Sequence, residues 1–586
     1  MKSCIKFLVV SAITAALLTA CSNSAVPVDK PVPTSLSSAS NKPEPQTSQL
    51  PPTSTPSTPD SHFEPEPPVE LKKSELPKGW KQSKTFSVNN VGGFNEVNVK
   101  LGDFIDSNDE ITAFLDAEST YYNIPSIHCN KPDDINMWAQ DLNNDGLNEL
   151  ILSAPAGAAY VQTMVIGFDK VAKKWLKLLD SNLLEAVDLD DDGVVEVIET
   201  SCGSLPPYVI IHRWNKGQFE KMDVTKATGN DYSMLRQEYF PPLIISGRPF
   251  ESYYYRYISG QLKEVKSKFL EASEYLILDS NKRKLTLDDI FDLSVYQIDL
   301  AKNEIYARHG YVFKNPEYEN YFNTKRWYSQ NPAFIEDNLG SIEKQNAVFL
   351  SEYAKNIKAN FREVESGMAI DLNGDNKTDS IKFECEPGGS KFTLNINGSK
   401  VTGNGDNLDG SIFVCNIDKD DKYKELAITE SGPSDDLATQ FFYYNGKEII
   451  PMGRVQGSGY SIKIDGSGIF TTSTRGEILQ TWFYTDKYRL SKEHKLENIP
   501  QEMYTMNTVV TVRKPISLNK DKNDSSETLD LAPLDIVLIR ASDNKEWCLV
   551  EDSSGNKGWL QIEGFYNIKG TDLTASDVFG GLCFAD

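Results

Sequence analysis

The sequence is poor in histidine and lacks the short motifs that mark common catalytic centres. It has five histidines among 586 residues, and no HExxH, GxSxG or glycine-rich phosphate loop occurs. These absences argue against the enzyme classes that such motifs mark. Carboxylates are abundant, however. An acid pair for glycoside hydrolysis therefore stays open, because the separation of two carboxylates is a property of the fold.

Positive charge is scarce relative to negative charge. The chain has 60 Lys and Arg against 84 Asp and Glu, a formal net charge of −24 and a sequence pI near 4.8. Because no basic cluster offsets this balance, we expect neither nucleic acid nor an anionic membrane surface as an electrostatic partner. A chain of 586 residues is too long for one core, so we expect about three or four domains.

The first residues have the pattern of an export signal. Lys2 and Lys6 form a positive start, and residues 7–17 form an apolar stretch too short to span a bilayer. Leu18-Thr19-Ala20-Cys21 then resembles the lipobox of bacterial lipoproteins. This resemblance implies that residues 1–20 are a signal peptide and that Cys21 carries a lipid. It places the protein on the extracytoplasmic side of a bacterial cell membrane; the alternative is an ordinary signal peptide that ends near a cysteine.

Large apolar residues are rare in the segment that follows. Residues 21–78 are dominated by Pro, Ser and Thr, a composition that cannot bury a core. We expect a disordered, semi-extended tether. No later apolar run reaches about 18 residues, so we expect no further membrane span.

Cysteine is sparse, and no CxxC occurs among the eight, which argues against zinc and redox chemistry. Outside the predicted signal peptide and Cys21, six remain, and nearest-neighbour pairing would keep each disulfide within one domain. The pairs would be Cys129 with Cys202, Cys385 with Cys415, and Cys548 with Cys583. The alternative is six buried free thiols.

A short acidic loop is the most repeated feature. The first three copies are Asp141-Leu-Asn143-Asn-Asp145-Gly146-Leu-Asn-Glu149, Asp188-Leu-Asp190-Asp-Asp192-Gly193-Val-Val-Glu196 and Asp371-Leu-Asn373-Gly-Asp375-Asn376-Lys-Thr-Asp379, and a looser fourth has Asn416, Asp418, Asp420, Asp421 and Glu425. Oxygen side chains at positions 1, 3, 5 and 9 suit Ca²⁺, a cation that takes six to eight oxygen ligands. Position 6 is Gly, Gly, Asn and Asp, the types that best tolerate the positive φ of a sharp loop. The alternative is a turn without metal.

Each loop runs into a β-branched or apolar stretch that predicts a strand rather than the helix of an EF-hand. Together with the loops, these stretches resemble the VCBS and FG-GAP repeats, in which such loops join strands and usually hold Ca²⁺. The resemblance implies one β-rich module at residues 79–272 and a second at 359–500, each with two Asp-rich loops.

Between the two modules the composition becomes helical. Ser294 and Gln297 form a capping-box pattern, a second helix starts at Asn315-Pro316, and a third covers about Ser341 to Ile357. The pentapeptide Tyr306-Ala307-Arg308-His309-Gly310 resembles the YARHG domain, which implies a small helical extracellular domain at residues 273–358. We expect Arg308 to pair with Glu304, His309 to stabilise the helix end and the aromatic residues to form the core. The alternative is that Arg308 and His309 bind an anionic or sugar ligand.

The last part of the chain has short β-rich runs. Residues 501–567 resemble a bacterial SH3 domain through Val512-Arg513, Trp547 and Gly558-Trp559, with a long acidic loop after Lys514-Pro515. The resemblance implies a small barrel that binds cell-wall peptide or glycan. Trp547 and Trp559 are candidate ligand contacts, although core positions are the usual place for such residues. Residues 568–586 are expected to be a C-terminal tail.

These features favour a multidomain, mainly β protein with Asp-rich-loop β modules, a small α-helical YARHG-like domain and a C-terminal SH3-like β-barrel. The first hypothesis is a non-catalytic surface protein that recognises the cell wall, a glycan or an envelope partner. The second is a sensory or scaffold component beside an envelope enzyme. The third is an envelope hydrolase with its active site in residues 80–270.

Overall fold

The computed structural model describes residues 59, 61–104, 110–129, 131–157, 160–201, 207–237, 239–248, 251–325, 327–364, 370–432 and 437–584. All of the described residues belong to one compact unit, Ser57–Asp586. The predicted signal peptide, Cys21 and most of the predicted tether lie outside the described residues. Within the described part, no helix is long and apolar enough to cross a membrane.

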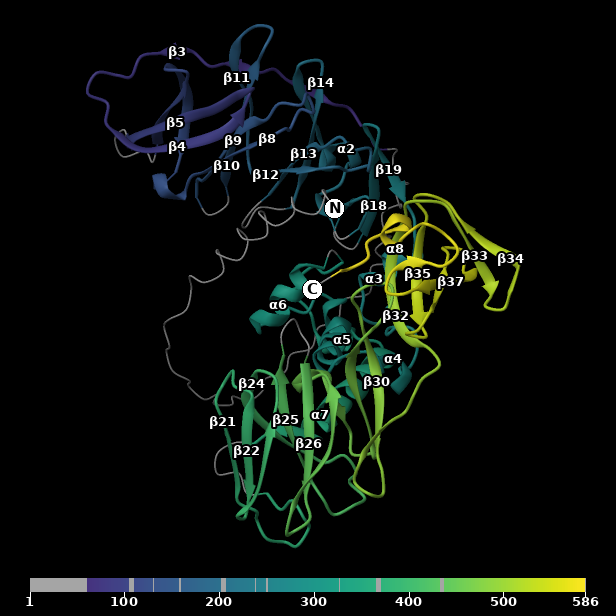
Figure 1. Cartoon of the computed structure of the whole chain (residues 1–586). Coiled ribbons are helices and arrows are strands. Elements are labelled where there is room, and N and C mark those ends of the chain that lie inside the picture. The colour runs from purple at the N-terminus through teal and green to yellow at the C-terminus, as the bar shows by residue number, and fades with distance from the viewer. Residues whose placement is uncertain are drawn as a thin grey trace, which may run out of the picture. The chain divides into compact units, whose positions relative to one another are not determined.

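The described chain is mainly β, as predicted, and its sheets are antiparallel (Figure 1). Residues 82–265 form four successive four-stranded meanders. The first contains β4 (Gln82–Val91), β5 (Phe94–Phe104), β6 (Glu110–Ala117) and β7 (Thr120–His128); the second β8 (Asn136–Gln140), β9 (Glu149–Pro155), β10 (Val161–Asp169) and β11 (Lys174–Ser181); the third β12 (Leu184–Val187), β13 (Glu196–Thr200), β14 (Val209–Asn215) and β15 (Gln218–Asp223); the fourth β16 (Tyr232–Arg236), β17 (Leu243–Arg248), β18 (Glu251–Ile258) and β19 (Gln261–Val265). Short helices η1 (Pro132–Asp134) and α2 (Val224–Thr228) lie between strands. Apolar residues of facing strands fill the cores, with Val99, Leu115 and Leu152 fully buried.

Three short strands precede these meanders and correct the predicted end of the tether at residue 78. They are β1 (Glu64–Glu66), β2 (Val69–Glu70) and β3 (Lys73–Ser74), and each adds to the last strand of a different meander: β15, β11 and β7. Phe63 and Leu71 are buried beside them. Regular strands are therefore already present within the Pro-rich segment.

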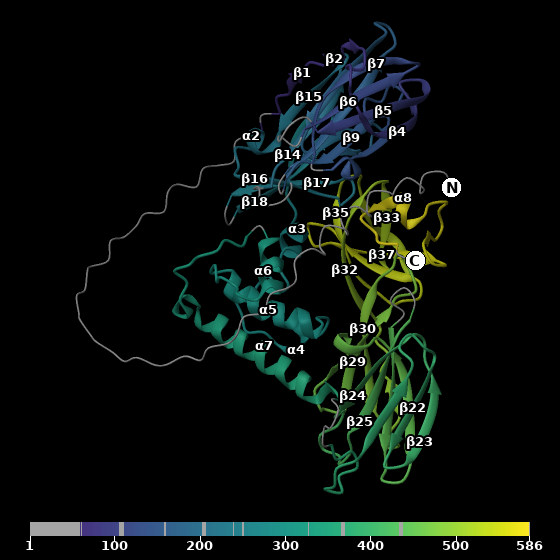
Figure 2. The ribbon, with the colours of Figure 1, turned by 90° about the vertical axis from the view of Figure 1, so that its left-hand side faces the viewer.

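The helical region confirms the three predicted helices and their caps. The helices here are α3 (Lys268–Ser273), α4 (Leu287–Ile290), α5 (Val295–Ala307), α6 (Pro316–Asn323), η2 (Glu336–Asn338) and α7 (Ser341–Asn360). Ser294 caps α5 in a capping box with Gln297, and Asn315 caps α6. Figure 2 shows α5 lying beside α6 and α7, and Ile298, Ile305 and Leu350 are fully buried between these helices.

The second β region follows the helices. Its largest sheet has the order β20-β24-β25-β26-β27, beside a three-stranded sheet β21-β22-β23 and a four-stranded sheet β28-β29-β30-β31. The strands are β20 (Phe361–Glu363), β21 (Ile381–Cys385), β22 (Lys391–Ile396), β23 (Ser399–Asn404), β24 (Leu408–Cys415), β25 (Glu425–Ser431), β26 (Leu437–Tyr444), β27 (Ile449–Gln456), β28 (Lys463–Ile464), β29 (Ile469–Arg475), β30 (Phe483–Leu490) and β31 (Leu496–Asn498), with η4 (Gly459–Ser461) before β28.

The C-terminal residues form one antiparallel sheet in the order β34-β33-β37-β36-β35-β32-β39, with β38 paired to β37. The elements are β32 (Tyr504–Val512), β33 (Ile516–Asp521), β34 (Asp524–Leu531), β35 (Ile536–Ser542), β36 (Trp547–Glu551), β37 (Lys557–Glu563), β38 (Asn567–Ile568), α8 (Ala575–Val578) and β39 (Phe579–Gly580).

Two predictions for this region are wrong. The segment expected to be a long acidic loop is the hairpin β33–β34. The expected tail is part of the core, because Val578 and Phe579 are buried against the sheet and β39 pairs with β32.

Candidate cation loops and the helical motif

The four acidic loops share one backbone scheme around their last carboxylate. In each loop, the N–H of the second residue donates to the final acid. The pairs are Leu142 with Glu149 at 2.8 Å, Leu189 with Glu196 at 3.2 Å, Leu372 with Asp379 at 2.8 Å, and Ile417 with Glu425 at 3.1 Å. Three of the loops also join two consecutive strands that pair with each other, β8–β9, β12–β13 and β24–β25. The final acid thus sits at the start of the strand predicted to follow the loop.

The first three loops also share their turn. The N–H of position 6 donates to the first aspartate, from Gly146 to Asp141, Gly193 to Asp188 and Asn376 to Asp371, at 2.7 to 3.0 Å. Position 6 has a positive φ in these three loops, as predicted, and so does position 4. Asp421 of the fourth loop does not have a positive φ. Its extra residue gives that loop a different turn, so the prediction of one backbone geometry for all four is wrong.

The final acids are unusually buried for carboxylates. Glu149, Glu196 and Glu425 have exposed fractions of 2 %, 6 % and 0 %. Burial, together with repulsion from neighbouring aspartates, raises the pKa of each to about 8. A buried carboxylate beside other acids needs either a proton or a cation to offset its charge.

Within the part of the chain that the structure describes, several oxygens of these loops have no hydrogen-bond partner. They are Asp141 Oδ1, Asp190 Oδ1, Asn416 Oδ1 and Glu425 Oε1, and all are buried. An orphaned buried acceptor is costly in a folded protein. Oxygen acceptors grouped in a tight turn are also the donor set that Ca²⁺ prefers, so the residues present fit this ion. In the third loop, by contrast, Asp379 accepts from both Leu372 and Asn397.

The second loop is the best assembled of the four. Among the described residues, Asp188, Asp190 and Asp192 form the one acidic group whose ligand oxygens all lie within 4.8 Å of one another. A cavity of about 380 Å³ opens beside this loop. Its lining includes Asn143, Asn144, Asp190, Asp192, Glu196, Arg213, Trp214 and Tyr257. Sequence reasoning missed Arg213, Trp214 and Tyr257, because they lie on β14 and β18 and no local motif connects them to the loop.

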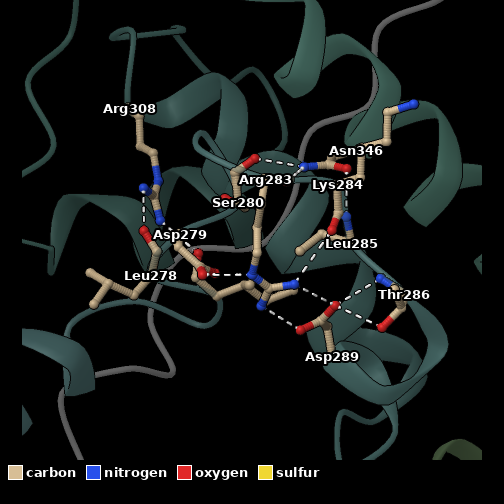
Figure 3. A network of polar contacts seen from close by, with 11 residues as sticks. Leu278, Asp279, Ser280, Arg283, Lys284, Leu285, Thr286, Asp289, Arg308 and Asn346 are labelled. Atoms are coloured by element: carbon tan, nitrogen blue, oxygen red, sulfur yellow. Dashed lines mark hydrogen bonds and ion pairs between the residues drawn. The ribbon is translucent and has the colours of Figure 1, made fainter.

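The Arg308 side chain organises the start of the helical region (Figure 3). Its guanidinium donates to the carbonyls of Ile277 and Leu278, both at 2.9 Å, and to Glu304 at 2.8 Å. Glu304 is fully buried and also accepts from the backbone N–H groups of Leu276 and Ile277. The predicted pairing of Arg308 with Glu304 is confirmed. The pair holds the incoming chain against α5.

The other residues of the pentapeptide also have structural partners. His309 Nε2 lies 2.9 Å from Glu343, whose other oxygen accepts from Gly340 N. The imidazole therefore contacts the start of α7, not only the end of α5 as expected. Gly310 has φ +80°, and a Cβ there would lie 2.6 Å from Ser329 O. The motif thus fixes how α5 meets its neighbours.

A second polar network in Figure 3 fixes the loop before α4. Asn346 donates to the carbonyls of Ser280 and Arg283 and accepts from Leu285 N. Arg283 bonds Asp289 through two nitrogens, at 2.6 and 2.9 Å. The guanidinium holds the pKa of Asp289 down to about 2. Asn346 thereby joins this loop to α7.

Trp547 and Trp559 lie outside the core of the C-terminal sheet. Alternation along β36 and β37 turns Cys548, Val550 and Leu560 inward, so the two indoles share the opposite, half-exposed face. The ammonium of Lys522 lies 5.8 Å from the Trp547 ring and 4.3 Å from the Trp559 ring. The expectation that core positions hold these residues is wrong.

Two of the disulfides considered are not formed. Cys415 is a fully buried thiol that donates to Glu425 O, and Cys548 is a thiol in the core of the C-terminal sheet, whereas Cys583 is exposed. Cys129 Sγ lies 3.0 Å from Lys131 O, and Cys202 lies outside the described residues.

Comparisons with known proteins bear mainly on the helical region. A search of curated proteins finds no match. Among solved structures, the chain is similar to the Bacillus licheniformis rhamnogalacturonan lyase PL11, at 11% sequence identity, covering 84% of this chain and 91% of the other. The TM-score is 0.15, too low to carry an argument about fold or function. Residues 273–359 match the family model of the YARHG domain, so the helical region is a YARHG domain.

Proposed function

We propose that the protein is a non-catalytic, lipid-anchored cell-surface protein whose β modules hold Ca²⁺ and serve in extracellular recognition. The loop scheme carries this proposal: four turns each place a carboxylate, three of them buried glutamates, beside further acids, and three leave buried oxygens without donors. VCBS-like and FG-GAP-like repeats remain the best description of the loops and the strands that follow them.

The residues that would hold Ca²⁺ follow from the donor set. In the first two loops they are Asp141, Asn143, Asp145 and Glu149, and Asp188, Asp190, Asp192 and Glu196. When bound, Ca²⁺ would neutralise the buried glutamate and fix the turn between two strands. The aspartate oxygens of the second loop lie within 4.8 Å of one another, closer than the roughly 5–9.5 Å typical of glycosidase acid pairs. This spacing supports a shared cation rather than hydrolysis.

Calorimetric titration of the full chain with Ca²⁺ tests the metal part of the proposal. We expect saturable uptake, and the isosteric variant Glu196→Gln should lose one site. At a hundredfold excess over its dissociation constant, each site adds about 2.7 kcal/mol to the stability of its module. Absence of uptake at millimolar Ca²⁺ would contradict the proposal.

Surface attachment and recognition need separate tests. Substitution Cys21→Ser should release the protein from the membrane fraction, and incorporation of labelled fatty acid should stop. Sedimentation of the full chain with purified cell wall tests recognition. The indoles of an SH3-like C-terminal barrel are the expected contacts, so Trp559→Ala should weaken sedimentation, whereas the exposed Trp138→Ala should not.

A further inference from the structure

The cavity beside the second acidic loop combines groups that no single motif supplies. It lies where the first loop, the second loop, β14 and the turn after β18 meet. Asn144 holds two of these walls together, because its amide donates to Val195 O at 3.2 Å and accepts from Val195 N at 3.3 Å. Ser259 N donates to Asp190 at 2.8 Å and holds the third wall. The walls are therefore fixed to the loop itself.

Among the residues that the structure describes, no donor reaches two carboxylate oxygens of this loop. Glu196, with 6 % of its surface exposed, lines the cavity and uses one oxygen for Leu189 N. Within the described part of the chain, its other oxygen receives no hydrogen bond. Asp190 Oδ1 is buried and likewise has no partner. Both acids line the cavity, so a cation bound by them would lie at its wall.

The rest of the lining offers an aromatic surface. Trp214 is half-buried and packs edge-to-face on Phe219, with ring centroids 5.0 Å apart. Tyr257, which is buried, also lines the cavity. A volume of about 380 Å³ falls in the range of small-molecule sites, roughly 300–1,000 Å³.

Charge decides which ligand class this lining accepts. Arg213, the one basic residue among the lining residues, is already paired with Glu220 through two nitrogens, at 3.0 and 3.2 Å. The summed negative charge of ionised Asp190, Asp192 and Glu196 is then larger than the positive charge of one divalent cation. An anionic ligand would be repelled, whereas neutral hydroxyl groups can complete the oxygen shell of Ca²⁺.

We infer that this cavity is a Ca²⁺-dependent site for a neutral saccharide, whose adjacent hydroxyls ligate the ion held by the second loop while its ring packs on Trp214. This inference rests on the proposed function and narrows it to one site and one ligand class. The first loop contributes to the wall of the cavity but does not ligate the ion.

Retention of the full chain on agarose-linked mannan, glucan and galactan, in millimolar Ca²⁺ or in excess EGTA, tests the inference. Polygalacturonate serves as the anionic probe. We expect retention on at least one neutral polysaccharide, complete loss in EGTA and no Ca²⁺-dependent retention on polygalacturonate. No retention on the neutral polymers, retention that survives EGTA, or Ca²⁺-dependent retention on polygalacturonate alone would overturn it.

Matched variants assign the effect to this cavity. Glu196→Gln keeps the acceptor for Leu189 N and should abolish retention. Glu149→Gln, the equivalent change in the first loop, should retain it, because Glu149 does not line the cavity. Trp214→Phe should weaken binding, and Trp138→Phe should leave it unchanged. Equal behaviour of both glutamine variants would place the site elsewhere and overturn the inference.

Calorimetry on the same sample separates the two proposals. Ca²⁺ uptake without saccharide retention overturns the ligand site and leaves the calcium loops standing. Absence of Ca²⁺ uptake contradicts the calcium loops, and retention that persists without the ion overturns the Ca²⁺-dependent site as well.

Discussion

His212 lies on β14 with 1 % of its surface exposed, between two glutamates. Its Nδ1 lies 2.7 Å from Glu66 and its Nε2 lies 3.4 Å from Glu199. Burial lowers the pKa of the imidazole, but the hydrogen bonds and charges of both glutamates outweigh burial and raise that pKa. Because Glu66 belongs to β1, the protonated His212 helps to hold β1 on its meander.

A raised pKa in the folded state gives stability that depends on pH. The contribution of His212 is full below the unfolded pKa of about 6.5 and is lost as pH rises through the folded pKa. We expect Glu66 and Glu199 to lose their partner in His212→Gln, at a cost of roughly 3 kcal/mol at pH 6. The cost should shrink at pH 9. Thermal unfolding at both pH values checks this, with the exposed His128→Gln as control; an equal cost at both values would contradict it.

Glu304 is another glutamate that depends on a cationic partner, here the guanidinium of Arg308. Glu304 has no exposed surface, and burial raises its pKa although Arg308 and two backbone N–H groups oppose this. Arg308→Ala would leave that carboxylate buried without its counter-charge, so we expect a loss of about 3–5 kcal/mol in the stability of the YARHG domain. Arg308→Ala combined with Glu304→Leu should recover much of the loss. Unfolding followed by circular dichroism measures both. No recovery in the double variant would show that the carbonyl contacts, not the charge, matter.

At the scale of elements, the features that were predicted are those that depend on residues close together in the sequence. Ser294 with Gln297, and Asn315 before Pro316, satisfy orphan N–H groups at helix starts, and both caps are present in the structure. The acidic loops were recognisable because their carboxylate and amide side chains lie within one short turn of the chain. The hairpin β33–β34 was missed because β34 is exposed over most of its length and lacks an apolar alternation. The cavity was missed because its walls come from separate strands.

Strand β2 and its neighbours were missed for a related reason. Leu71 has 4 % of its surface exposed, and its N–H donates to Trp175 O, but one leucine in a Pro-rich segment is too weak a signal. Leu71→Ala should cost about 2–4 kcal/mol through the cavity it leaves. Val69→Ala, at a position that is 54 % exposed, should cost little. Limited proteolysis around residue 75 compares the two, and equal cleavage would mean that the tether does extend to residue 78.

At the scale of the unit Ser57–Asp586, the C-terminal sheet packs against the fourth meander and α3. Ile536 lies in one apolar cluster with Leu243, Tyr254 and Phe269 from the fourth meander and α3. Arg256, with 4 % of its surface exposed, donates to Leu534 O at 2.6 Å and to Thr511 at 3.0 Å. The C-terminal sheet and the fourth meander with α3 therefore share a contact surface.

This shared surface predicts how the protein unfolds. Arg256→Met would leave Leu534 O and Thr511 without their donor in the contact, so the C-terminal sheet should unfold separately and at lower temperature than in the unchanged chain. Arg248→Met is the matched control, because Arg248 is exposed and donates to Gly229 O within its own module. Calorimetric scans should show an added low-temperature transition for Arg256→Met alone. If the transition of the C-terminal sheet is already separate in the unchanged chain and does not move in Arg256→Met, the two regions are coupled by their covalent connection rather than by this contact.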